Sequence, residues 1–365
     1  MRSASVASKI MKKVDYSNTK ISDLIGTGKV DLLEPTGHYN VSKYNWAYQA
    51  WKKHQQAHWI GEEIPMSEDI KSWAIDLEVE ERNLLIHLFR FFVQSDVEVS
   101  DNYFKSYVNL FKPLPIQMMM AAFTNMETIH YDSYALILTT LGMPDTEFSA
   151  FKEYREMQDK VDYMHSFPLE TCADVSRNIA MFAAFTEGLM LFSSFVMLLN
   201  FSRFGAMKGM SKIVDLSLKD ENAHCEGMMQ LFHEWNKQTG SLTKEVKKDI
   251  YEICKKMIEL ENKFIDLAFS CGKVRGMQAE DIKEYILYTA DYRICQLGLK
   301  PFNGYFKKEK QEYKQIKPHP IAWAVSLVSG SSITNFFENK EINYSKGATT
   351  GNWGQVWEDF DKIKK

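Results

Sequence analysis

The sequence predicts an all-α protein, a helical bundle with a dimetal carboxylate site in its core. One observation is a pattern that occurs twice, in which a lone carboxylate is followed about thirty residues later by Glu-x-x-His. Another is that glycine and proline are scarce between about residues 67 and 300, where the helical period dominates. With 365 residues, of which 45% are hydrophobic, the chain can bury one large core.

The repeated pattern supplies the ligands of a metal pair. Its two copies are Asp96 followed by Glu127 and His130, and Glu187 followed by Glu221 and His224. Each Glu-x-x-His places an oxygen and a nitrogen ligand on one face of a helix. The intervals of 31 and 34 residues between the lone carboxylate and the second glutamate suit two antiparallel helices. Two such hairpins would bring together four carboxylates and two imidazoles, as ferritin-like dimetal proteins do.

The first elements follow from turn signals and caps. Residues 1–40 are rich in turn residues and are expected to form an arm over the body. A first helix is expected over 42–58. A Ser67 or Asp69 cap then begins at least one long helix, which continues through Asp96.

Prolines and glycines delimit the next helix. Pro113 and Pro115 precede the helix that carries Glu127, and Gly142 and Pro144 end it. Further helices are expected near 146–165, 173–201, 208–238, 243–272 and 279–298.

The remaining segments complete a single-domain plan. β signals are few, with one short pair of strands expected within 270–290. From Pro301 the composition shifts to lysine, proline and glycine. The expected division is an arm over 1–40, a helical domain over 41–337 and a flexible tail over 338–365.

One stretch is apolar enough to raise the question of a membrane span. It reads IAMFAAFTEGLMLFSSFVMLL and has Glu187 in its middle. A carboxylate there is costly in lipid, and the polar flanks are modest. The stretch is therefore interpreted as a buried core helix whose one charge ligates metal, and no membrane association is expected.

Charge and cysteine content indicate which partners and which cellular location to expect. The net charge is −4 and no basic face alternates with aromatics, so nucleic acid is not an expected partner. The five cysteines form no Cys-x-x-Cys, which favours a reducing, cytoplasmic location. Cys225, next to His224, is expected to be a buried structural thiol, because adjacent residues diverge on a helix.

Several stretches, in order, resemble the radical-generating small (beta) subunit of class I ribonucleotide reductases. They are HWIGEEIPMSED, FFVQSDVEV, METIHYDSY, EGLMLFSSF, KDENAH, and HPIAW followed by ENKEINYSKG, and they extend from about Trp59 to Tyr344. The resemblance implies that one metal ion is held by Asp96, Glu127 and His130, and the other by Glu187, Glu221 and His224. It also implies that Tyr134, seven residues after Glu127, carries a tyrosyl radical.

The resemblance also implies a route for the radical. Trp59 matches the family's buried tryptophan, and Asp220 the aspartate that links it to the metal-bound His130. Tyr344 matches the tail tyrosine that passes the radical to the large (alpha) subunit, where ribonucleotides are reduced to deoxyribonucleotides. The small subunit is expected to be a homodimer that docks the large subunit through its C-terminal tail.

Several alternatives stay open at this point. Di-iron is the first expectation, but dimanganese and mixed manganese–iron centres use the same ligands. Glu98 is a second candidate for the place of Asp96, and Lys219 stands where many family members have arginine. One rival function is a ferritin-like dimetal oxidase that acts on an organic substrate in its own pocket. Another is a storage or structural bundle. The oxidase has no need of Trp59, Asp220, Tyr344 or a docking tail. A storage bundle predicts cage-forming surfaces and iron turnover without chemistry at Tyr134.

Overall fold

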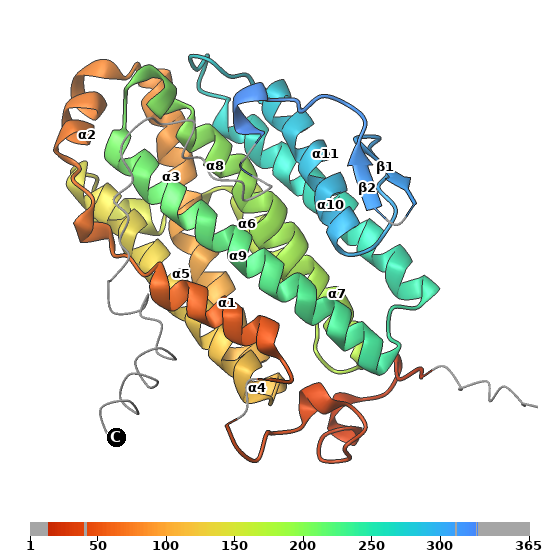
Figure 1. The fold of residues 1–365 in the computed structure, drawn as a ribbon. Coiled ribbons are helices and arrows are strands. Elements are labelled where there is room, and N and C mark those ends of the chain that lie inside the picture. Colours follow the sequence, from red (N-terminus) through yellow and green to blue (C-terminus); the bar gives the residue numbers. More distant parts are fainter. Residues whose placement is uncertain (1–13, 40–41, 311, 326, 328–365) are drawn as a thin grey trace, which may run out of the picture.

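The computed structural model describes residues 14–39, 42–310, 312–325 and 327. Long helices lie side by side at similar inclinations, and a small β-hairpin lies beside two of the later helices (Figure 1). Over the described residues only two short strands accompany the helices. The predicted all-α class is therefore confirmed.

The α-helices account for most of the bundle. They are α1 (Asn45–Gln56), α2 (Ser67–Lys71), α3 (Val79–Asp101), α4 (Val108–Leu110), α5 (Leu114–Thr140), α6 (Arg155–Met164), α7 (Cys172–Ile179), α8 (Leu191–Leu199), α9 (Lys208–Thr239), α10 (Lys244–Ala268) and α11 (Ala279–Gln296). Wider, π-helical segments are Ser72–Asp76, Asn102–Tyr107 and Ala180–Met190. Short 3-10 helices are Ile21–Asp23, Asp31–Leu33, Gly61–Glu63, Asp145–Phe148, Ala150–Glu153, Phe201–Phe204 and Ala322–Ala324.

The apolar stretch is the central helix of the bundle. Helix α7, the π-helical segment Ala180–Met190 and α8 follow one another without a break, because the residues at both junctions keep helical dihedral angles. The helix Cys172–Phe204 is long and apolar enough to cross a membrane, but its most apolar window is 100% buried inside the protein. The interpretation as a buried core helix is confirmed.

The long helix expected to reach Asp96 is interrupted. Leu77 has an extended backbone (φ −95°, ψ 137°), so α2 and its π-helical extension end there. Helix α3 begins with a capping box. The Glu78 side chain accepts a hydrogen bond from the backbone N–H of Glu81, and the Glu81 side chain accepts one from the backbone N–H of Glu78. The charged run that reads as helix interior in the sequence is thus a helix start.

Asp69 caps a different helix from the one expected. Its carboxylate accepts hydrogen bonds of 2.8 Å from the backbone N–H groups of Gly209 and Met210, in the first turn of α9. An anionic acceptor at a helix N-terminus satisfies otherwise unpaired N–H groups and interacts favourably with the positive end of the helix dipole. Asp69 therefore fixes the segment that follows Trp59 to the helix that carries Asp220.

The strand prediction was wrong in its position. The hairpin consists of β1 (Phe306–Glu309) and β2 (Glu312–Gln315), paired antiparallel, and not of residues within 270–290. In that interval the structure has only an isolated bridge between Val274 and Met277. The hairpin lies in the lysine-rich segment. Because most of its residues are exposed, its sequence lacks the alternation of apolar and polar residues by which strands are predicted.

The described part of the N-terminal arm packs against the body. The backbone N–H of Tyr16 donates to the carbonyl of Thr239 (2.8 Å), and Lys20 forms a bridge with Thr171. Leu32 is fully buried in the core. The expected tail, residues 338–365, lies outside the described residues, as does Tyr344.

A buried ion pair joins α6 to α10. The Lys160 ammonium lies 2.7 Å from a Glu261 carboxylate oxygen, and both side chains are fully buried. The ammonium also lies over the rings of Phe91 and Phe264, at 3.6 and 4.0 Å from their centroids, and the Ser193 hydroxyl donates to Glu261. Burial lowers the pKa of Lys160 to about 8, against the opposing effect of Glu261.

Candidate metal centre

Four helical segments bring the predicted ligands together in the core. Asp96 lies on α3, Glu127 and His130 on α5, Glu187 on the π-helical segment, and Glu221 and His224 on α9. Helix α3 packs against α5, and the π-helical segment packs against α9, so each expected hairpin is present. All six side chains are at most 1% exposed.

The six side chains form two groups that share one residue. One group contains Asp96, Glu127 and His130, and the other contains Glu127, Glu187, Glu221 and His224. Within each group the nearest ligand atoms all lie within 4.8 Å of one another. Glu127 can therefore bridge two metal ions, a role for which a carboxylate with two oxygens is suited.

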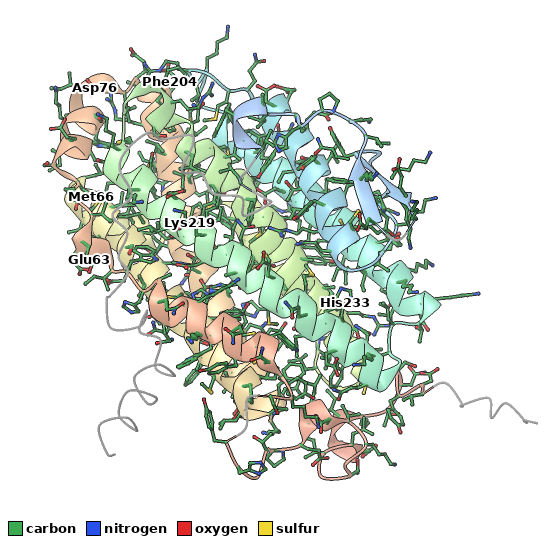
Figure 2. All side chains as sticks on the ribbon, viewed as in Figure 1. Glu63, Met66, Asp76, Phe204, Lys219 and His233 are labelled. Carbon is green, nitrogen blue, oxygen red and sulfur yellow. The ribbon has the colours of Figure 1, made fainter. Side chains whose placement is uncertain are left out.

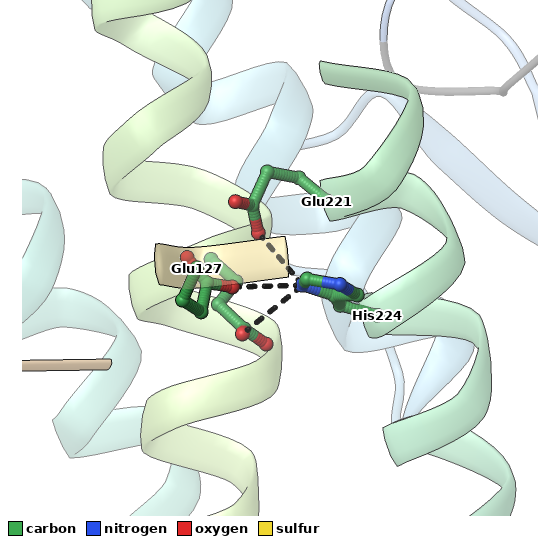
Figure 3. Close-up of side chains that lie close together, drawn as sticks. Glu127, Glu221 and His224 are labelled. Atoms are coloured by element: carbon green, nitrogen blue, oxygen red, sulfur yellow. Dashed lines mark ion pairs between the residues drawn. The ribbon is translucent and has the colours of Figure 1, made fainter. Parts of the chain in front are cut away.

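Both histidines direct the same nitrogen into the centre. His224 Nδ1 lies 2.9 Å from Glu127 Oε1, 3.5 Å from Glu221 Oε2 and 3.8 Å from Glu187 Oε1 (Figure 3). His130 Nδ1 lies 3.2 Å from Glu221 Oε1 and 3.3 Å from Glu127 Oε2. Each Nδ1 thus faces carboxylates of the two ligand groups, and each Nε2 is the outer nitrogen of its ring.

Burial and the clustered charges raise the pKa values of carboxylates and of a histidine at the centre. Burial and the charge of Glu127 raise the pKa of Asp96 well above its usual range, and burial and Glu221 do the same for Glu187. Burial alone lowers the pKa of His224, but the carboxylates of Glu127 and Glu221 outweigh it and raise the pKa to about 10. Four carboxylates cannot all be ionised here without cations.

A pair of metal ions fits this donor set. No hydrogen bond of good geometry from a described residue reaches Glu187 Oε1 or either carboxylate oxygen of Glu221. Buried polar atoms without partners are rare in folded proteins, and these face the neighbouring ligand atoms. Divalent ions would replace the protons and neutralise the charge, with the mixed oxygen and nitrogen ligands that iron and manganese accept.

Asp220 connects Trp59 to His130, as the resemblance implied. The indole N–H of Trp59 donates to Asp220 Oδ2 (2.9 Å), and His130 Nε2 lies 3.2 Å from the same oxygen. The rings of Trp59 and His130 are nearly parallel, with centroids 6.0 Å apart. A carboxylate on the outer nitrogen fixes the ring so that Nδ1 is free to bind a metal.

Tyr134 lies in the same core, one helical turn after His130 on α5. Its side chain is fully buried, and its ring centroid lies 4.9 Å from that of Phe92. Burial and the charge of Asp96 raise the pKa of Tyr134 well above its usual range. The phenol is therefore neutral, shielded from water and close to the first group.

Two residues at the centre escaped the sequence reasoning. Tyr103 lies on the π-helical segment after α3, and its hydroxyl donates to Glu187 Oε2 (2.9 Å). Its spacing was a usable signal, since it follows Asp96 by seven residues, as Tyr134 follows Glu127. His54 on α1 is also buried, and its sequence context offered no comparable signal.

The remaining candidates lie elsewhere. Glu98 pairs with His165 (2.6 Å) and belongs to neither ligand group. Lys219 lies on α9 (Figure 2), and its ammonium pairs with the Asp215 carboxylate (3.1 Å). The Cys225 thiol is buried and donates to the carbonyl of Ala183 (3.2 Å), as expected of a structural cysteine.

Comparisons with known proteins agree with the fold and identify a family. The family described as "Ribonucleotide reductase, small chain" matches residues 38–311. The probable ribonucleoside-diphosphate reductase small subunit 376L of Invertebrate iridescent virus 6 is 33% identical, over 90% of this chain and 99% of its own length.

Solved structures share the fold at lower identity. The ribonucleotide reductase R2 subunit from Clostridium botulinum superposes with a TM-score of 0.72 at 23% identity, over 80% of this chain and 92% of its own. The dimanganese(II)-NrdF of Streptococcus sanguinis superposes with a TM-score of 0.63 at 19% identity, over 73% and 94%. These likenesses confirm the ferritin-like helical bundle. With the family match over most of the chain, they show that this protein belongs to the ribonucleotide reductase small chains, an oxidoreductase family.

Proposed function

We propose that this chain is the radical-generating small subunit of a ribonucleoside-diphosphate reductase. Its dimetal centre would oxidise Tyr134 to a stable tyrosyl radical, which is passed to the large catalytic subunit. The observation that carries the proposal is the link from Trp59 through Asp220 to His130. A protein that only stores metal, or that oxidises a substrate beside the metals, has no use for this link.

The assignment of ligands follows the two groups. Asp96, Glu127 and His130 would hold one ion, and Glu187, Glu221 and His224 the other, with Glu127 shared between them. Two such ions, when bound, would supply the chemistry by which oxygen or a related oxidant takes one electron and the phenolic proton from Tyr134. We propose di-iron as the native pair. Dimanganese and mixed manganese–iron pairs are the alternatives, because all three accept these ligands.

The chain's own side chains hold the geometry that a stored radical requires. The buried apolar neighbours of Tyr134, among them Phe92, exclude water and external reductants. Asp220 orients His130 through its outer nitrogen and accepts the indole N–H of Trp59, so a proton has a fixed acceptor beside the indole.

Partners and location complete the proposal. Residues 338–365 would dock the large subunit, and Tyr344 would pass the radical across that contact. The active small subunit would be a homodimer in the cytoplasm, with no nucleic acid or membrane partner. Light scattering on the purified protein, alone and with the large subunit, tests both associations.

The rival dimetal oxidase makes a different demand on the structure. It requires a substrate cavity that reaches the metal ligands. A cleft of about 390 Å³ opens beside Glu98, Lys105 and His165, but none of the six ligands lines it.

Electron paramagnetic resonance tests the proposal. Metal-free protein is reloaded with ferrous iron and exposed to air, with a manganese sample in parallel and a metal count on both. We expect two ions per chain and a tyrosyl signal that is absent from Tyr134→Phe. The same signal in Tyr134→Phe would overturn the radical assignment. Two bound ions without a radical under any loading would favour the oxidase.

A further inference from the structure

His54 is a buried histidine at the centre that the proposed function leaves without a task. Only 4% of it is exposed, and its Nε2 has no hydrogen-bond partner among the described residues. Its Nδ1 lies 3.6 Å from Asp220 Oδ1, the oxygen of that carboxylate that neither Trp59 nor His130 uses. Its ring centroid lies 5.0 Å from that of His224.

The outer nitrogen of His224 lacks a hydrogen-bond acceptor among the residues that the structure describes. Its Nδ1 faces the carboxylates, so a bound metal would take the Nδ1 lone pair and leave the proton on Nε2. That Nε2 is buried and also has no hydrogen-bond partner within the described part of the chain. Metal-bound histidines almost always donate their second N–H to an acceptor, as His130 does to Asp220.

His54 is the neighbour that can accept this proton. The rings close to His224 are those of Phe123, His54, Tyr103 and His130. Phenylalanine offers no acceptor atom, and His130 has both nitrogens engaged. The Tyr103 hydroxyl donates to Glu187, and its ring centroid lies 6.1 Å from that of His224, farther away than the 5.0 Å of His54.

The spacing of the rings fits an end-to-end hydrogen bond. A ring nitrogen lies roughly 1.1 Å from its centroid, and an N–H···N bond spans about 3 Å, which puts joined centroids roughly 5 Å apart. The observed 5.0 Å agrees with this separation, and both Nε2 atoms are buried without another hydrogen-bond partner among the described residues.

We propose that His54 is a positioning residue that joins His224 to Asp220. His224 Nε2–H donates to His54 Nε2, and His54 Nδ1–H donates to Asp220 Oδ1. A single tautomer of each ring then satisfies every outer nitrogen at the centre, and both metal-binding histidines depend on one carboxylate. The inference rests on the proposed function only in that it assigns the two groups to metal ions.

The test uses cobalt(II) binding in the Asp96→Ala background, where only the group that contains His224 keeps all its ligands. His54→Leu removes both hydrogen bonds, whereas the amide of His54→Gln can accept from His224 and donate to Asp220. We expect His54→Leu to weaken cobalt binding about 10–100-fold, the usual effect of losing such a partner. His54→Gln should stay within about threefold of the parent.

A second readout follows the proton itself. In the cobalt-loaded wild type, the exchangeable N–H of His224 should appear as a slowly exchanging, hyperfine-shifted proton resonance, and His54→Leu should lose it. Unchanged cobalt affinity and an unchanged resonance in His54→Leu would overturn the proposal. So would a His54→Gln protein that melts like the parent but binds cobalt as weakly as His54→Leu.

These measurements do not depend on radical formation. A wild type that binds both cobalt ions but yields no tyrosyl radical with iron would contradict the proposed function alone. The comparison of the His54 variants would still decide the hydrogen bond.

Discussion

Glu127 is the one ligand shared by both groups, so its replacement should have a larger effect than that of any other ligand. Glu127→Ala leaves two ligands in the group of Asp96 and three in the group of His224. Asp96→Ala leaves two ligands in its own group but all four in the other. We therefore expect two bound ions in the wild type, one at full affinity in Asp96→Ala, and at most one, held weakly, in Glu127→Ala, where both groups have lost a ligand.

The number of bound ions should determine how far metal raises the melting temperature of each protein. An ion present at about 100 times its dissociation constant stabilises the folded state by about 2.7 kcal/mol, so two ions contribute about 5.4 kcal/mol. A chain of 365 residues has an unfolding entropy of roughly 0.8 kcal/mol/K. Manganese(II) should then raise the melting temperature by about 7 °C in the wild type, about half as much in Asp96→Ala and hardly at all in Glu127→Ala.

Calorimetry with and without manganese(II), in the absence of oxygen, measures these shifts, and equilibrium dialysis counts the ions. Glu98→Ala is the matched control, because Glu98 lies on the same helix as Asp96 but in neither group. Comparing each variant with its own metal-free form cancels the gain from removing a buried carboxylate. Equal shifts in Glu127→Ala and Asp96→Ala would refute the shared-ligand reasoning.

Further predictions concern the buried ion pair and Tyr103. Lys160→Met leaves the buried Glu261 without its cation and should lower the free energy of unfolding by about 3–5 kcal/mol in urea. Adding Glu261→Leu should recover most of that loss, and a double variant as unstable as the single one would contradict this. Because burial lowers the pKa of Lys160 to about 8 from an ordinary 10.5, the unfolded chain binds more protons between these pH values. The free energy of unfolding of the wild type should therefore rise with pH in that window relative to the double variant. A fall would mean that the pKa of Lys160 is raised on folding, and it would contradict the dominant effect of burial. Tyr103→Phe removes the hydrogen bond to Glu187 and should destabilise the metal-free protein by about 1 kcal/mol. It should leave the tyrosyl signal of Tyr134 intact. Loss of the signal in Tyr103→Phe would contradict the assignment of the radical to Tyr134.

The helices and the ligand groups were predictable because they rest on spacing. Glu-x-x-His fixes two ligands to one helical face regardless of the surroundings, and the long apolar stretch around Glu187 has no plausible place except the core. The structure places all six of these side chains together.

The parts that were missed depend on contacts that spacing does not encode. Nothing marks Leu77 as a break, since it is neither glycine nor proline and an extended leucine has no steric cost. The β-hairpin is mostly exposed, so its sequence shows little alternation. His54 reaches the centre only because α1 packs against α5 and α9, a tertiary contact that no local pattern near residue 54 announces.

The π-helical segment Ala180–Met190 determines how the two halves of the central helix face their neighbours. A turn of this kind holds more residues than an α-helical turn, so it rotates α8 about the helix axis relative to α7. In a regular helix, deleting one residue rotates everything beyond it by roughly 100°. Because a wide turn already contains an extra residue, a one-residue deletion between Glu187 and α8 can close it to an α-helical turn, whereas an insertion would turn the packing face of α8 away from α3 and α9. Insertions should therefore be tolerated in the loops of this protein and excluded from this segment.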